Sequence, residues 1–200
     1  MIVTDIKICK KNQILIYADG EYLISMSAEI FSKSKLKKGS YIDQEILNSI
    51  MQSVNSYKAK EKALNILSYR SHSKKEIIDK IKRNFGEECA KETANKLESI
   101  GLVNDKEFAL NYIRQLSEIK RYGIKRIKLE LSKKGIHPEL ISEIVEEINI
   151  DENSNLEYII NKKNIKSLKT EKELNRAIAY LMRLGYSWSQ VRSVLKLNKE

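Results

Sequence analysis

Between Gly123 and Gly135 the chain reads GIKRIKLELSKKG, which is the pattern of an amphipathic helix closed by a glycine. The apolar spacing of this helix occurs three times at an offset of 50 residues, in the pairs Ile77/Ile81, Ile127/Leu131 and Ala177/Leu181. A glycine closes each copy, at Gly86, Gly135 and Gly185. Such a period is typical of stacked helical repeats, because one unit is too small to bury its own apolar face.

Around this central helix each copy has room for two more helices. The predicted helices span 58–69, 74–85 and 87–100 in the first copy, 106–121, 124–134 and 138–148 in the second, and 155–164, 171–184 and 188–195 in the third. A hydroxyl residue followed three positions later by Glu or Gln indicates a capped helix start at Ser73, Thr170 and Ser187. We therefore expect a mainly α-helical protein whose three three-helix repeats, 58–105, 106–150 and 151–200, stack into an elongated array.

The first 43 residues have the shorter period of β-strands. Strands are predicted at 2–9, 13–18 and 21–26, and Asp19-Gly20 between the last two is typical of a hairpin turn. A short helix is predicted at 27–34. Residues 44–57 are predicted to form a connecting helix, which either continues into the first repeat or breaks near 53–56. A small antiparallel β region at 1–43 is thus expected to precede the helical array.

The composition limits the class of protein. Hydrophobic residues make up 42% and charged residues 32% of the chain, which is typical of a soluble globular protein. No apolar run approaches the ~18 residues that a membrane span needs, and charges interrupt the N-terminus where a signal peptide is apolar. Cys9 and Cys89 lack metal-binding or redox spacing and are expected to be reduced thiols. The sequence therefore predicts a cytoplasmic protein without membrane contact.

Residues that support catalysis or cofactor binding do not occur in any recognisable arrangement. The seven glycines fall at the ends of predicted elements, so the sequence has no Gly-rich phosphate loop. His72 and His137 each lie in a helix connection, without a His or Cys at metal-ligand spacing. Position alone suggests no pair of nucleophile and base. We therefore expect a protein that is not an enzyme and needs no metal or cofactor.

The net charge of +10 and the pI of about 9.4 favour a polyanionic partner such as nucleic acid. The charge is also segregated along the chain. Residues 106–135 contain nine Lys/Arg and three acids, and residues 162–200 contain ten Lys/Arg and three acids. Between them, residues 136–161 contain seven acids and no Lys/Arg. Segregation of this kind creates separate positive and negative surfaces. The alternative is an ordinary basic protein without a polyanionic partner.

Basic residues recur around the central helix of every repeat and are predicted to form a stripe along the array. Such a stripe is suited to following a phosphate backbone, whereas the competing explanation is a Lys-rich face that only keeps the protein soluble. The candidate binding residues are Arg70, Lys74, Lys75, Lys82 and Arg83 in the first repeat, Lys120, Arg121, Lys125, Arg126, Lys128, Lys133 and Lys134 in the second, and Arg176 and Arg183 in the third.

Several motifs resemble the RecX family of regulatory proteins in their order and spacing. The run ALNILSYRSHSKKEI, from Ala63 to Ile77, is similar to the opening of the family's first repeat. The run GLVND at 101–105 resembles its link between repeats, 123–136 resembles its second-repeat signature, and RLGY at 183–186 resembles its third-repeat ending. The resemblance covers about residues 58–197, and the N-terminal β region resembles an addition found in longer members.

The resemblance implies a curved array of three-helix repeats that binds the RecA recombinase filament on single-stranded DNA, with double-stranded DNA as a further candidate. It implies a negative regulator that lies in the filament groove and suppresses ATP hydrolysis, strand exchange and co-protease activity. It also implies a role in DNA repair and the SOS response, without enzymatic activity or a cofactor. Nothing in the sequence demands a dimer, so we expect a monomer.

Two other functions stay open at this point. A general DNA-binding protein built from three-helix units would act without RecA and bind bare DNA with a steep salt dependence. A scaffold for some other protein would bind neither DNA nor the filament at physiological salt. An enzyme is a more distant alternative, because no constellation of residues supports one.

Overall fold

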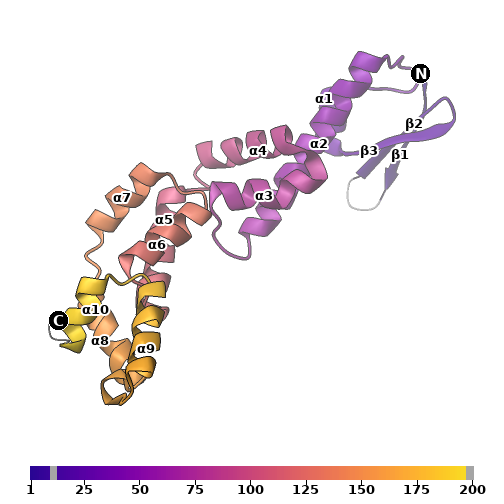
Figure 1. Cartoon of the computed structure of the whole chain (residues 1–200). Helices are drawn as coiled ribbons and strands as arrows, with labels where there is room; N and C mark the ends of the chain where they lie inside the picture. Colours follow the sequence, from indigo (N-terminus) through magenta and orange to yellow (C-terminus); the bar gives the residue numbers. More distant parts are fainter. Residues whose placement is uncertain (10–12, 197–200) are drawn as a thin grey trace. The chain divides into compact units, whose positions relative to one another are not determined.

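The computed structural model of the protein describes residues 1–9 and 13–196, which form a three-stranded sheet followed by a mainly helical chain (Figure 1). This confirms the predicted class, mainly α with a small antiparallel β region at the N-terminus. By its internal contacts the chain divides into two compact units, Met1–Tyr69 with Ile78–Lys96, and Arg70–Ile77 with Leu97–Glu200.

The N-terminal sheet consists of three antiparallel strands in sequence order, β1 (Val3–Cys9), β2 (Gln13–Ala18) and β3 (Glu21–Ser27). Asp19 and Gly20 both have positive φ angles, 50° and 89°, as the tight turn between β2 and β3 requires. The side chains of β2 alternate as predicted, with Ile14, Ile16 and Ala18 buried. The sequence pattern therefore identified both the hairpin and the face of β2 that enters the core.

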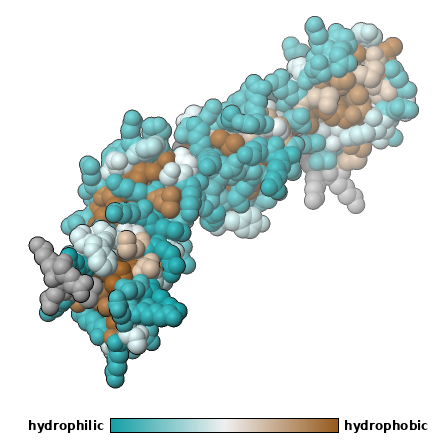
Figure 2. Space-filling view, viewed as in Figure 1, coloured by the Kyte–Doolittle hydropathy of each residue, from teal (hydrophilic) through white to brown (hydrophobic). Residues whose placement is uncertain are grey.

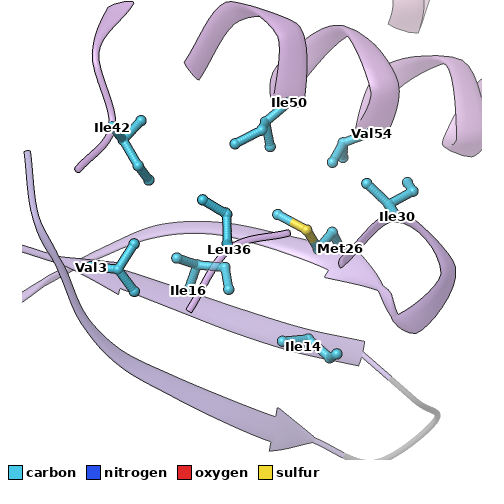
Figure 3. Close-up of a cluster of buried hydrophobic side chains, with 9 residues drawn as sticks. All are labelled: Val3, Ile14, Ile16, Met26, Ile30, Leu36, Ile42, Ile50 and Val54. Carbon is cyan, nitrogen blue, oxygen red and sulfur yellow. The ribbon is translucent and has the colours of Figure 1, made fainter. Parts of the chain in front are cut away.

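Helices α1 (Ala28–Ser34) and α2 (Gln44–Leu67) supply the other side of this core. The buried side chains of the sheet, of the two helices and of the segment between the helices point toward one another in Figure 3, and they are Val3, Ile14, Ile16, Met26, Ile30, Leu36, Ile42, Ile50 and Val54. The Ser27 hydroxyl caps α1 by accepting a hydrogen bond from the Ile30 N–H at 3.4 Å.

Helix α2 is continuous, so the alternative in which the chain breaks near 53–56 is wrong. The Asp43 carboxylate caps its start by accepting from the Ile46 N–H at 2.7 Å. The Ser53 hydroxyl donates to the Ser49 carbonyl at 2.9 Å, which satisfies this polar group inside the helix. Val54 and Ala59 are both buried, and their burial stabilises the helix across the predicted break.

The remaining helices follow the predicted order closely. They are α3 (Lys74–Phe85), α4 (Glu87–Ser99), α5 (Asp105–Arg114), α6 (Ile124–Lys133), α7 (Pro138–Glu147), α8 (Glu152–Lys162), α9 (Glu171–Arg183) and α10 (Trp188–Leu195). Helices α5 to α7 pack around Phe108, Ile113, Ile127, Leu131 and Ile144. Helices α8 to α10 pack around Leu156, Ile160, Leu181, Tyr186 and Val191.

The helix predicted at 106–121 is wrong in its second half. Helix α5 ends at Arg114 and a π-helical segment, η1 (Gln115–Ile119), follows. Leu116 and Ser117 are adjacent and both buried, and a π turn brings the two side chains to the interior together. The Lys120 N–H accordingly bonds to the Gln115 carbonyl, five residues earlier, at 3.3 Å.

The third repeat differs from its prediction at its start. The predicted helix 155–164 in fact begins at Glu152, because the Asp151 carboxylate caps it by accepting from the Ser154 N–H at 2.9 Å. A short 3₁₀ segment, η2 (Ile165–Ser167), then precedes α9. Within α9, Ile178 is more deeply buried than Ala177, which stands at the predicted repeat position.

The three predicted capping boxes form to different degrees. At Ser187 the box is complete, because its hydroxyl accepts from the Gln190 N–H and the Gln190 amide oxygen accepts from the Ser187 N–H. At Thr170 the hydroxyl accepts from the Glu173 N–H at 3.3 Å. At Ser73 only half of the box forms: its hydroxyl accepts from the Glu76 N–H at 3.2 Å, while the Glu76 carboxylate turns elsewhere.

Candidate nucleic-acid interface

Helix α6 presents one apolar and one basic side, as its sequence predicts. Ile127 and Leu131, one turn apart, have no exposed surface, whereas Lys125 and Lys128 are exposed. Neither lysine has an ion-pair partner among the residues that the structure describes. These two ammonium groups are therefore available to an external anion.

Two other cations of α6 are paired with an acid on the same helix. The Arg126 guanidinium lies 2.8 Å from the Glu130 carboxylate and 5.7 Å from the centre of the Tyr122 ring. Lys133 contacts the same carboxylate at 3.0 Å. The Arg126 Nε is buried without a hydrogen-bond partner within the described residues. Arg126 is thus part of the packed structure as well as a candidate for binding.

Lys134, at the end of α6, contacts the start of α3. The Lys134 ammonium pairs with the Glu76 carboxylate, which also receives the Arg70 guanidinium at 3.3 Å. Burial acts to raise the pKa of Glu76, but hydrogen bonds from Lys134 and Arg70 hold this pKa below its usual value. The Ser73 hydroxyl donates to the Lys134 carbonyl at 2.7 Å. The candidate binding residues near position 70, near position 75 and at position 134 therefore lie close together in the fold.

Lysines at the start of α3 are also engaged. The Lys74 ammonium contacts the Glu98 carboxylate at 2.7 Å, and the Lys75 ammonium donates to the Lys133 carbonyl at 3.3 Å. The Lys74 backbone N–H donates to the Asp105 carboxylate at 2.7 Å. Burial raises the pKa of Asp105, and this hydrogen bond offsets part of the rise. Both lysines are therefore held in place by contacts within their own unit.

Arg121 has a structural environment that its sequence position did not suggest. Its guanidinium donates to the Asn155 amide oxygen and lies 4.9 Å from the centre of the Tyr158 ring. Its carbonyl accepts a hydrogen bond from the Tyr186 hydroxyl at 2.7 Å. Arg121 therefore links the second repeat to the third. Its neighbour Lys120 is exposed and has no ion-pair partner in the described part of the chain.

The basic residues of the third repeat lie on α9, whose end meets the start of α6. The Gly123 N–H donates to the Leu184 carbonyl at 2.9 Å, so the two helix ends touch through their backbones. Arg176 and Arg183 are exposed, and neither forms an ion pair within 1–9 and 13–196. The structure thus brings the C-terminal end of α9 next to the basic helix α6.

Two candidates belong to the other unit. Lys82 pairs with Asp79 at 2.6 Å, and hydrogen bonding to this acid raises the pKa of Lys82. Arg83 is exposed, with no ion-pair partner among the described residues. Hydrophilic side chains cover most of the visible surface over α3 and α4, as expected for helices whose apolar residues point inward (Figure 2).

Sequence reasoning missed the acidic residues that hold the repeats together. The Glu152 carboxylate accepts from the Ile124 N–H at 2.8 Å and from the Gln190 amide at 2.8 Å. Asp105 makes the equivalent bond to the start of α3. Both acids are the first residue of a helix, which is an ordinary place for an acid on local grounds. No local pattern distinguishes them from acids that cap only their own helix.

Groups that would support metal binding do not gather in the part of the chain that the structure describes. No cluster of three or more His, Cys, Asp or Glu has metal-binding geometry there. His72 is buried and its Nδ1 contacts the Arg70 carbonyl at 2.8 Å, while Cys9 and Cys89 are free thiols. Across 1–9 and 13–196 no helix combines the length and the apolar character required to cross a membrane.

Comparison with known proteins assigns the chain to a family. Its residues 1–43 match the "Regulatory protein RecX N-terminal domain", 59–97 match the first RecX three-helix domain, and 104–144 match the second. It is 32% identical over 199 residues to the regulatory protein RecX of Clostridioides difficile (strain 630), with 97% of this chain and 94% of the relative covered. The chain belongs to the RecX family.

Other RecX proteins agree with this assignment. The regulatory protein RecX of Clostridium acetobutylicum is 30% identical over 198 residues, which cover 94% of this chain and 90% of the relative. These family members are named as regulators, which suggests a function other than catalysis. The predicted resemblance to RecX is confirmed.

Solved RecX structures share the fold. A crystal structure of regulatory protein RecX aligns with a TM-score of 0.74 at 22% identity and covers 98% of this chain and 99% of its own. RecX from Lactobacillus salivarius aligns with a TM-score of 0.56 at 27% identity, over 71% of this chain and 95% of its own. The first of these alignments extends over the N-terminal β region as well as the helices.

Proposed function

We propose that this chain is a negative regulator of the RecA recombinase, which binds the RecA filament on single-stranded DNA and inhibits its ATP hydrolysis, strand exchange and co-protease activity. The RecX resemblance supports RecA as the partner. The observation that supports contact with the nucleoprotein is the exposed side of α6, where Lys125 and Lys128 lie one turn apart without intramolecular partners among the described residues.

The charge of α6 suits a phosphate backbone. An unpaired ammonium binds phosphate without first breaking an internal ion pair, and each such contact releases condensed counterions from DNA. Lys120, Arg176 and Arg183 are exposed in the same unit and are proposed to extend the contact. In the other unit, Lys82 and Arg83 are proposed to make further contacts.

The paired cations have a second part in this proposal. Arg70, Lys74, Lys75, Arg121, Arg126, Lys133 and Lys134 each contact an acid, an amide or a carbonyl of the chain. We assign them the task of holding the helices in place, and those with exposed nitrogen atoms also add positive potential to the surface. The protein is proposed to act as a monomer in the cytoplasm, where a RecA filament would form.

A general DNA-binding protein is the second candidate, and the same unpaired lysines support it. It differs from RecA regulation in one respect: its effect on RecA would require enough protein to cover the DNA. The competing proposals therefore predict different stoichiometries of inhibition.

The deciding experiment is a titration of RecA's ATP hydrolysis on single-stranded DNA at physiological salt. RecA regulation predicts inhibition at well below one copy per RecA protomer. Binding of the chain to the same DNA without RecA is measured in parallel as the control. Inhibition that follows saturation of bare DNA, or no inhibition, would contradict the proposal.

A further inference from the structure

A cavity of about 380 Å³ lies between α5, η1, the end of α6 and the segment that precedes α3. All of its lining residues belong to one unit of the chain. Its lining includes Arg70, Phe108, Asn111, Tyr112, Gln115 and Lys134. Pockets in the range of roughly 300–1,000 Å³ accommodate small organic ligands. This cavity therefore has room for a single nucleotide.

The wall of the cavity retains positive charge. Arg70 and Lys134 share a single acid, Glu76, so two cations face one anion. The Arg70 side chain is 53% exposed, and its bonds to Glu76 are long, at 3.3 and 3.4 Å. The guanidinium also donates to the Ser71 carbonyl at 2.9 Å. Of its five N–H donors, these three contacts leave two free for a phosphate oxygen.

An aromatic ring lies in the same wall. The centre of the Tyr112 ring is 5.6 Å from that of Phe108, with 26° between the planes, and this stacking holds the ring in place. The Lys134 ammonium lies over the Tyr112 ring at 5.5 Å from its centre. Rings and guanidinium planes beside a cationic wall are the groups on which unstacked bases pack in single-stranded nucleic acid complexes.

Two amides complete the wall. Asn111 and Gln115 are one helical turn apart and exposed, and both line the cavity. Neither amide has a hydrogen-bond partner among the residues that the structure describes. An amide offers both a donor and an acceptor, which is what the edge of a base requires.

We propose that this cavity binds one unstacked nucleotide of single-stranded DNA, with its phosphate on Arg70 and Lys134, its base against Tyr112 and its base edge on Asn111 and Gln115. The inference rests on the proposed function for the presence of single-stranded DNA. It adds that the protein contacts bases as well as phosphates. Duplex DNA does not offer such a base, because its bases are stacked and paired.

The test compares the full chain on two oligonucleotides of equal length, oligothymidine and its abasic counterpart, at physiological salt and without RecA. The wild-type protein should bind the oligothymidine more tightly. The double variant Asn111→Ala/Gln115→Ala should lose roughly three- to tenfold in affinity for the oligothymidine only, because an abasic strand has no base edge to lose. The double variant Asn153→Ala/Asn161→Ala, which removes two exposed amides of α8, should bind both strands like wild type.

The possible outcomes separate the sources of binding. Equal affinity of the wild type for both strands, or an equal loss on both, would overturn the proposal. A cavity variant that binds both strands normally but no longer inhibits RecA would also overturn it, because the occupant would then be a group on RecA. If the wild-type protein prefers the oligothymidine to the abasic strand but does not inhibit RecA, the result would support the nucleotide cavity and contradict only the proposed regulatory function.

Discussion

Gly123 and Gly185 allow two helix ends to meet backbone to backbone. A Cβ on Gly123 would lie 2.7 Å from the carbonyl carbon and oxygen of Gly185, closer than real contacts permit. Gly123 has an ordinary φ of −73°, so the glycine is needed for space and not for its conformational freedom. Gly185 has a φ of +102°, and a Cβ added at Gly185 would lie 2.5 Å from the backbone nitrogen of Arg126.

We predict that Gly123→Ala destabilises the protein by roughly 2 kcal/mol, because the added methyl group can be accommodated only if α6 and α9 move apart. Urea unfolding followed by circular dichroism measures the change. The control is Gly101→Ala, which has a φ of +75° but no neighbour within 4 Å of the added atom. It should cost about 1 kcal/mol from backbone strain alone. A Gly123→Ala protein as stable as wild type would show that the junction is loose.

At the scale of helices, the two junctions of the central helices are built alike. The first backbone N–H of α3 donates to Asp105, which opens α5, and the first backbone N–H of α6 donates to Glu152, which opens α8. The carbonyl of Lys134 accepts from Ser73, and that of Leu184 accepts from Gly123. Each junction thus satisfies groups that helix ends otherwise leave unpaired.

Glu76, which joins α3 to the end of α6, makes the first junction sensitive to acid. Hydrogen bonds from Lys134 and Arg70 lower its pKa in the folded protein below the usual 4.5. A carboxyl whose folded pKa is lowered contributes stability above its unfolded pKa, and loses that contribution as the pH falls through the folded value. The stabilisation by Glu76 is therefore present at neutral pH and disappears under acidic conditions.

We predict that Glu76→Gln lowers the free energy of unfolding by roughly 1 kcal/mol at pH ~7 and by much less at pH ~3. Urea titrations at the two pH values measure the difference between variant and wild type. Glu157→Gln serves as the control, because Glu157 is exposed on α8 and has no ion-pair partner within the described residues. A gap between Glu76→Gln and wild type that stays constant with pH would argue against this ion-pair cluster.

Over the whole molecule, the net charge of +10 is less informative than the positions of the exposed cations that have no acidic partner among the described residues. Exposed ion pairs within the protein compete with binding to an external phosphate, whereas Lys125 and Lys128 have no such competition among the described residues. Their effect on binding should therefore exceed that of a surface lysine held in an ion pair, such as Lys133. Arg126 is unsuitable for charge reversal, because it pairs with Glu130 and its Nε is buried.

We predict that Lys125→Glu/Lys128→Glu weakens binding to the RecA filament on single-stranded DNA by roughly tenfold or more and reduces its salt dependence, without changing unfolding. The double variant Lys166→Glu/Lys169→Glu has the same net charge and alters exposed lysines between α8 and α9. Filament affinity at several salt concentrations measures both. Equal losses in the two variants would mean that only the total charge matters.

The helices and the hairpin could be predicted from the chain alone, because they depend on neighbours in sequence. Ile127 and Leu131 define a buried helix face, Asp19-Gly20 defines a turn, and Ser187 with Gln190 defines a helix start. The π segment at 115–119 escaped prediction, because adjacent burial of Leu116 and Ser117 depends on what packs against α5.

The partners of the basic residues were decided only by the tertiary structure. Arg121 contacts Asn155, and Lys134 contacts Glu76. The partners in each pair are far apart in the sequence, so the periodicity of a single helix does not predict their contact. Sequence places these two cations with Lys125 in one class, whereas folding pairs the first two and leaves Lys125 without a partner among the described residues. The physical reason is that periodicity records which face of a helix is buried, while the partner of a charge depends on chain segments that folding brings within a few ångströms.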